Sequence, residues 1–197
     1  MQKSHYVHIF RRRKEGKTDY RKRRGMVVGR KPFLAVRVSG RYVYAQILKP
    51  TANGDITICN ASSRDLAKKF GWKGSAKNLP GAYLTGYYLG KLAPKNELGS
   101  VVVYSGVGRF VHGSRIASLL DGAKAAGLEV QIGDESLPKE DREKGQHISE
   151  FAKKLQSEDR ARFNQLFSKL ISAGFDPANY PAHFEQVKAA IDSGVKN

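Results

Sequence analysis

Apolar residues alternate with polar or aromatic ones along residues 33–47, and this alternation limits the folds open to the chain. Successive side chains of a β-strand point to opposite faces of a sheet, so a period of two predicts half-buried strands. Gly40-Arg41 interrupts the pattern and predicts a turn between two paired strands. A second turn at residues 53–55 leads into a third strand over residues 56–58. The segment therefore predicts a three-stranded antiparallel meander.

The two faces of this predicted meander differ in chemistry. One face is aliphatic and consists of Leu34, Val36, Val38, Val43, Ala45 and Ile47. The opposite face carries Phe33, Arg37, Tyr42, Tyr44 and Gln46. Two interpretations of this second face stay open. It lies beneath helices in a sheet covered on both sides, or it is an exposed surface suited to stacking on bases and ribose.

Helix signals follow the meander. Ser62-Ser63 can cap a predicted helix from Arg64 to Phe70, and either Asn78 or the Leu79-Pro80 pair opens a longer one that runs to about Ala93. In the longer helix small residues recur at helical spacing, and we expect this stripe to let the backbone approach the sheet closely. The stripe consists of Ala82, Gly86 and Gly90.

Further strands and helices complete an α/β pattern. A buried strand is expected at residues 101–104, then a Gly-rich loop to Gly113, a helix over 114–126 and a short strand over 128–130. Strand, helix and strand in succession predict a parallel pair added to the meander. From Pro138 onward the apolar residues keep a helical period, and the last helix is expected over residues 181–191.

The positive charge is concentrated at the start of the chain. Residues 1–31 hold 12 basic and 2 acidic side chains, a net charge of +10 out of +17, whereas residues 50–197 carry a net charge of only +4. A helix is expected over residues 13–30, but it has too few apolar positions to bury a face. Such a segment repels itself unless a dense polyanion neutralises it, and nucleic acid is the leading candidate.

These patterns give the following fold class and domain organisation. The chain is predicted to be α/β, with a mixed sheet of an antiparallel three-strand meander plus parallel strands, and with packed helices. A basic N-terminal extension spans residues 1–31, the α/β core spans residues 32–133, and a helical C-terminal extension spans residues 134–197.

Other site chemistry finds little support in the sequence. The single cysteine, Cys59, excludes an internal disulfide and a multi-cysteine metal site. No secretory signal and no apolar run of the ~20 residues needed for a membrane span are present. The histidines lack metal-ligand spacing. We therefore expect no catalytic residues, no metal and no cofactor.

A glycine-rich loop leaves one enzymatic alternative open. Residues 106–113 lie between a predicted strand and a helix, but they lack the third glycine of a dinucleotide-binding loop. A nucleotide-acting enzyme that uses this loop is one alternative function, and a free regulatory protein that binds RNA or DNA is another. A non-enzymatic interpretation of this loop is that backbone amides near Arg109 and Arg115 hold an RNA phosphate.

Several segments together resemble one protein family. These are residues 11–20, 36–39 with 42–47, 78–86, 121–130 and 145–148. In this order they are similar to the universal 5S-rRNA-binding protein of the large ribosomal subunit. The tail after Val130 resembles the archaeal and eukaryotic type, and the total length fits the archaeal form.

The resemblance implies a structural, non-enzymatic protein of the cytoplasmic ribosome. It would bind 5S rRNA, attach it to 23S rRNA in the central protuberance and meet neighbouring large-subunit proteins, with no membrane and no small-molecule substrate as partner. Cationic side chains would neutralise phosphates, while the hairpin meets the RNA surface. The residues expected to contact RNA are Arg11, Arg12, Arg13, Lys14, Lys17, Tyr20, Arg21, Lys22, Arg23, Arg24, Arg30, Lys31, Arg37, Arg41, Tyr42, Tyr44, Arg109 and Arg115.

Overall fold

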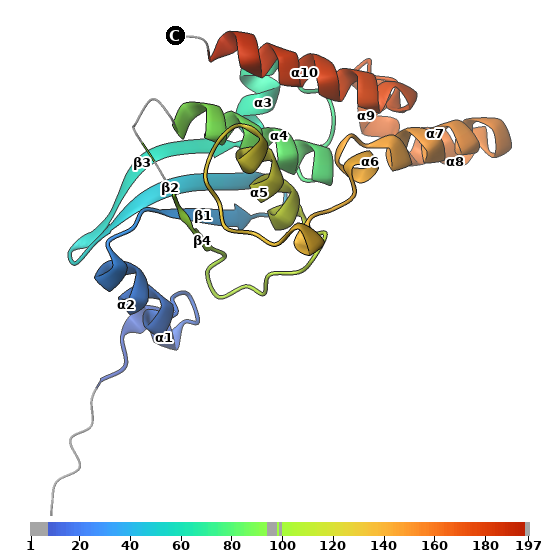
Figure 1. Ribbon diagram of the computed structural model, residues 1–197. Coiled ribbons are helices and arrows are strands. Elements are labelled where there is room, and N and C mark those ends of the chain that lie inside the picture. The colour runs from blue at the N-terminus through green and yellow to red at the C-terminus, as the bar shows by residue number, and fades with distance from the viewer. Residues whose placement is uncertain (1–7, 94–97, 99, 196–197) are drawn as a thin grey trace, which may run out of the picture.

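A computed structural model describes residues 8–93, 98 and 100–195, and within these residues the strands form one four-stranded sheet (Figure 1). Its order is β3-β2-β1-β4. Neighbouring strands β1 and β2, and β2 and β3, pair antiparallel, whereas β4 pairs with β1 in parallel. The predicted α/β class, with a meander plus a parallel strand, is confirmed. The strands are β1 (Phe33–Val38), β2 (Val43–Thr51), β3 (Gly54–Ser62) and β4 (Val102–Tyr104).

Helices cover one face of the sheet (Figure 1). The aliphatic side chains predicted to share a face lie there, and all are buried except Val38, which is half-buried; Leu34, Val43 and Ile47 are fully inaccessible to solvent. The helices after the meander are α3 (Ser63–Phe70), α4 (Leu79–Leu92) and α5 (Arg115–Ala125). Their first turns are capped as expected, because Ser62 and Asp65 form a capping box and Asn78 accepts from the N–H of Gly81.

Helices α4 and α5 cross at a very short backbone distance. A Cβ placed on Gly86 would overlap the carbonyl oxygen of Leu119, and one on Gly122 would overlap the carbonyl oxygen of Tyr83. The expectation that the small-residue stripe approaches the sheet is therefore wrong for Gly86 and Gly90. Both glycines approach α5 instead, and α5 carries a glycine of its own at the crossing.

The parallel part of the sheet is smaller and more exposed than expected. In β4, which lies at the sheet edge, Val102 is 45% exposed, so the prediction of a buried strand holds only for the preceding Val101. Residues 128–130 do not form a strand, since they contribute one isolated bridge between Val130 and Val101. Among the residues that the structure describes, β4 therefore ends the sheet, with Val130 adding a single bridge beside it.

The C-terminal helices divide into two groups. Helix α10 buries Tyr180, Phe184, Val187 and Ile191 in the same apolar core as the sheet. Helices α7 and α8 enclose a separate small cluster of Ala152, Leu155 and Phe163. The helices are α6 (Glu140–Glu143), α7 (Gln146–Glu158), α8 (Arg160–Leu166), α9 (Ser168–Ser172) and α10 (Tyr180–Gly194), with short 3-10 turns η2 (Asp134–Ser136) and η3 (Pro177–Asn179).

Candidate nucleic-acid interface

The basic N-terminal extension forms two helices rather than the single helix expected over residues 13–30. They are α1 (Arg11–Lys14) and α2 (Tyr20–Gly29). Gly16 adopts a φ of +63° between them, and the Asp19 carboxylate caps α2 by accepting from the N–H groups of Arg21 and Lys22. A left-handed glycine followed by a capping aspartate ends one helix and starts another.

An ion pair holds α2 against the sheet. Arg23 Nη1 lies 2.6 Å from Asp55 Oδ2 in β3, and Arg23 Nη2 donates to the carbonyl oxygen of Thr51 at 3.5 Å. The hydrogen bond to Asp55 raises the pKa of Arg23. Arg23 is among the residues predicted to contact RNA, and in this structure its guanidinium also fixes the position of the helix that carries the other cations.

Nearby contacts extend this anchor. Phe10 and Tyr20 stack with ring centroids 4.8 Å apart, and Arg12 Nε donates to Thr18 Oγ1 at 2.9 Å. Burial raises the pKa of Tyr104 in β4, and the negative charge of Asp19 raises it further. Polar and aromatic contacts thus position the extension, because no residue of α1 or α2 is buried.

Most predicted cationic residues of the extension reach solvent. Arg11 and Lys17 both pair with Glu15, at 3.6 Å and 2.8 Å, and both remain more than half exposed. These exposed pairs contribute little stability and leave the charges available to an anion. The other exposed cations are Arg12, Arg13, Lys14, Arg21, Lys22, Arg24, Arg30 and Lys31.

The second sheet face is open at one end and covered at the other. Arg37 and Tyr44 are direct cross-strand partners, and Tyr44 is 38% exposed. Tyr42 packs edge-on against Tyr44 with centroids 6.5 Å apart, and Arg41 is exposed at the turn. A doubly covered sheet is therefore the wrong interpretation at this end.

Phe33 differs from the rest of the predicted aromatic face. It is only 2% exposed, since Tyr104 of β4 packs edge-on against its ring at a centroid distance of 5.7 Å. Phe33 therefore contributes to folding and offers no stacking surface. Sequence reasoning missed both Tyr104 and Asp55, because their partners lie far away in the chain and leave no local pattern.

The glycine-rich loop is a separate, exposed region. Arg109 lies in the loop, and Arg115 is the first residue of α5; both are exposed. Ser114 caps α5 by accepting from the N–H of Ala117. The loop also exposes Val107, Phe110 and Val111.

The described residues give no sign of a metal site or a membrane span. No group of three or more His, Cys, Asp or Glu side chains among them could hold a metal ion. Over the same part of the chain, no helix is long and apolar enough to cross a membrane. The features that remain are a cationic extension anchored on a folded core and an exposed Arg–Tyr surface, which are typical of RNA-binding proteins.

Comparisons with known proteins identify the family. A family model described as "Ribosomal large subunit proteins 60S L5, and 50S L18" matches residues 4–100. The large ribosomal subunit protein uL18 of Sulfurisphaera tokodaii is 45% identical over 94% of this chain and 94% of its own. The uL18 of Caldivirga maquilingensis is 44% identical over 92% of this chain and 88% of its own. The uL18 of Saccharolobus solfataricus is 44% identical over 93% of this chain and 92% of its own.

These likenesses place the chain among the structural proteins of the large ribosomal subunit. Within that class, it belongs to the uL18 family. The expected archaeal-type ribosomal protein is confirmed, and with it a cytoplasmic place on the ribosome. The relatives carry ribosomal names, so the alternative of a nucleotide-acting enzyme is not supported.

Proposed function

We propose that this protein binds 5S rRNA and helps attach it to 23S rRNA in the central protuberance of the large subunit. The observation that carries the proposal is the arrangement of α1 and α2. Their cations are exposed, none of their residues is buried, and the Arg23–Asp55 pair fixes them on the core. Such a surface releases counterions when it meets a phosphate backbone.

The sheet supplies a second contact in this proposal. Arg37, Arg41, Tyr42 and Tyr44 lie together at the open end of the β1–β2 hairpin, where planar side chains stack on unpaired bases or ribose. Arg109 and Arg115 would bind phosphates beside the start of α5. Phosphate contacts position the protein, and the shape of the folded RNA provides the selectivity.

Each part of the chain has a distinct role in this proposal. Residues 1–31 bind RNA, residues 32–133 form the scaffold, and residues 134–197 face neighbouring large-subunit proteins. Exposed apolar side chains of α7 and α8, Phe151 at 47% and Leu166 at 55%, support the last assignment.

Sedimentation of a tagged chain in cell lysate tests the proposal. The protein should travel with large subunits, and at low magnesium it should leave them in a small particle that contains 5S rRNA. A protein that remains free of ribosomal subunits would overturn the proposal. Recovery with the large subunit but never with 5S rRNA would contradict the RNA assignment alone.

A further inference from the structure

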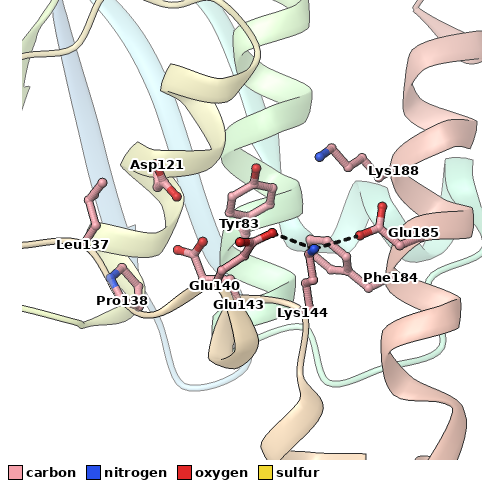
Figure 2. Close-up of a pocket in the computed structure, with 10 residues that line it drawn as sticks. All are labelled: Tyr83, Asp121, Leu137, Pro138, Glu140, Glu143, Lys144, Phe184, Glu185 and Lys188. Carbon is pink, nitrogen blue, oxygen red and sulfur yellow. Dashed lines mark ion pairs between the residues drawn. The ribbon is translucent and has the colours of Figure 1, made fainter. Parts of the chain in front are cut away.

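An acidic cavity of about 500 Å³ lies among α4, α5, α6 and α10 (Figure 2). The charge of its carboxyl groups is opposite in sign to the net charge of the protein, which is +17. Tyr83 and Phe184 contribute aromatic walls. The charged lining residues are Asp121, Glu140, Glu143, Glu185, Lys144 and Lys188.

Glu143 is the unusual member of this group. Glu143 is only 4% exposed. Its Oε1 atom has no hydrogen-bond partner among the residues that the structure describes. A buried polar atom without a partner is costly, so it must be protonated or receive a partner from outside. Burial, together with a hydrogen bond to Asp121, raises the pKa of Glu143 to about 9, which keeps it protonated in the free protein.

The two lysines of the cavity already contact other residues that line it. Lys144 Nζ lies 2.6 Å from Glu140 and 3.9 Å from Glu185. Lys188 Nζ lies over the rings of Tyr83 and Tyr87, 5.7 Å and 5.3 Å from their centroids. The cavity therefore has more carboxyl groups than cations, and one of its aromatic rings already contacts a cation.

We propose that this cavity receives the guanidinium group of an arginine side chain from a neighbouring protein of the large subunit. A guanidinium is planar, donates two parallel hydrogen bonds to one carboxylate and stacks on aromatic rings, which matches Glu143, Asp121 and Tyr83. A phosphate would be repelled by these carboxylates, so the occupant is protein and not RNA. This inference rests on membership of the family and not on the proposed binding of 5S rRNA.

A titration of the full chain with Nα-acetyl-arginine amide tests the chemistry of the site. The carboxyl ¹³C signal of Glu143 should shift in a saturable way, whereas uncharged Nα-acetyl-citrulline amide, of nearly the same shape, should leave it unmoved. Glu143→Gln keeps the shape of a protonated carboxyl group, but it should bind the arginine probe about tenfold more weakly, as expected for the loss of a charge-assisted hydrogen bond. Glu158→Gln, an exposed change outside the cavity, should bind as the natural chain does.

The pH dependence of binding gives an independent readout. The titratable groups that line the cavity with Glu143 are Tyr83 from α4, Asp121 from α5, Glu140 from α6, Lys144 directly after α6, and Glu185 and Lys188 from α10. Since the arginine binds ionised Glu143, its affinity should rise between pH 7 and pH 9, by up to about tenfold per pH unit for one released proton.

The tests separate this inference from the RNA-binding proposal. Equal shifts with the arginine and citrulline probes, or an affinity that does not change with pH, would overturn the inference using the natural chain alone. Unweakened binding to Glu143→Gln would also overturn it. Affinity for 5S rRNA should be the same in Glu143→Gln and in the natural chain, so a failure of either proposal can be recognised separately.

Discussion

Arg23 of α2 and Asp55 of β3 form a 2.6 Å ion pair that joins the basic extension to the sheet. Both side chains are about three-quarters buried, and their residues lie 32 positions apart in the chain. The pair engages one of the positive charges of the extension and gives the remaining charges a fixed place. It also provides a sharp test of whether position or net charge controls RNA binding.

Asp55→Asn should weaken binding of 5S rRNA although it makes the protein more positive. The expected loss is about threefold to tenfold, or roughly 0.7–1.4 kcal/mol, because α2 loses its anchor. Asp134→Asn is the matched control, since Asp134 pairs with Lys124 at a distant exposed site. Filter binding measures both variants, and tighter binding by Asp55→Asn would show that net charge alone controls affinity.

Removal of residues 1–31 should separate RNA binding from folding. None of the residues of α1 and α2 is buried, so thermal unfolding of the remaining chain should change little. Binding to all RNAs should weaken, and the salt dependence should flatten, because the phosphate contacts are lost. Calorimetry and filter binding give the two quantities. Unfolding of the shortened chain would show that the extension is part of the core.

Tyr44→Ala and Phe33→Ala should have opposite effects. Tyr44 is exposed on the open sheet face, and its loss should cost about 1–3 kcal/mol of RNA binding if it stacks on a base. Phe33 is buried against Tyr104, and its loss should cost about 3–5 kcal/mol of folding free energy. Chemical unfolding and RNA binding of both variants decide the matter. A destabilised Tyr44→Ala with normal RNA affinity would place Tyr44 in the core.

Gly86→Ala should destabilise the protein by about 3 kcal/mol, at the upper end of the cost of overpacking, because the added methyl group meets the Leu119 carbonyl group of α5. Gly40→Ala is the control, since nothing lies within 4 Å of a Cβ at that position. Urea unfolding compares the two variants with the natural chain. Equal stability of both would contradict the close crossing of α4 and α5.

The raised pKa of Glu143 predicts a loss of stability at alkaline pH. Its pKa is about 9 in the folded protein against an ordinary value of 4.5, so the folded state holds a proton that the unfolded state releases. Stability from this group is complete below about pH 4.5 and falls as the pH rises towards 9, by up to about 1.4 kcal/mol per pH unit. Glu143→Gln should remove this slope, as measured by urea unfolding at pH 5, 7 and 8.5. An unchanged slope would show that Glu143 is ionised in the folded chain.

Local patterns were sufficient to predict much of the fold. The alternation of Leu34, Val36 and Val38 placed the buried face of the sheet, and Asn78 placed the start of α4, because both signals act within a few residues. The partner of Gly86 was predicted wrongly, and the sequence left open whether Phe33 is buried. Each depends on a residue distant in sequence, Leu119 or Tyr104, and no local period reports such contacts.

The candidate site shows the same division. The concentration of charge in residues 1–31 predicted an exposed cationic surface, since charge follows directly from residue identity. The break between α1 and α2 and the role of Arg23 as an anchor were not predicted, because they depend on backbone conformation at Gly16 and on pairing with Asp55.

The salt dependence of 5S rRNA binding tests the central claim most directly. If at least six phosphates are neutralised, the logarithm of the binding constant should fall with the logarithm of salt concentration with a slope of about −4 or steeper. The measurement uses the full chain, 5S rRNA and an unrelated RNA of equal length between 50 and 300 mM salt. We predict this slope together with tighter binding of 5S rRNA at every salt concentration. A nearly flat salt response, or equal affinity for the two RNAs, would contradict the account.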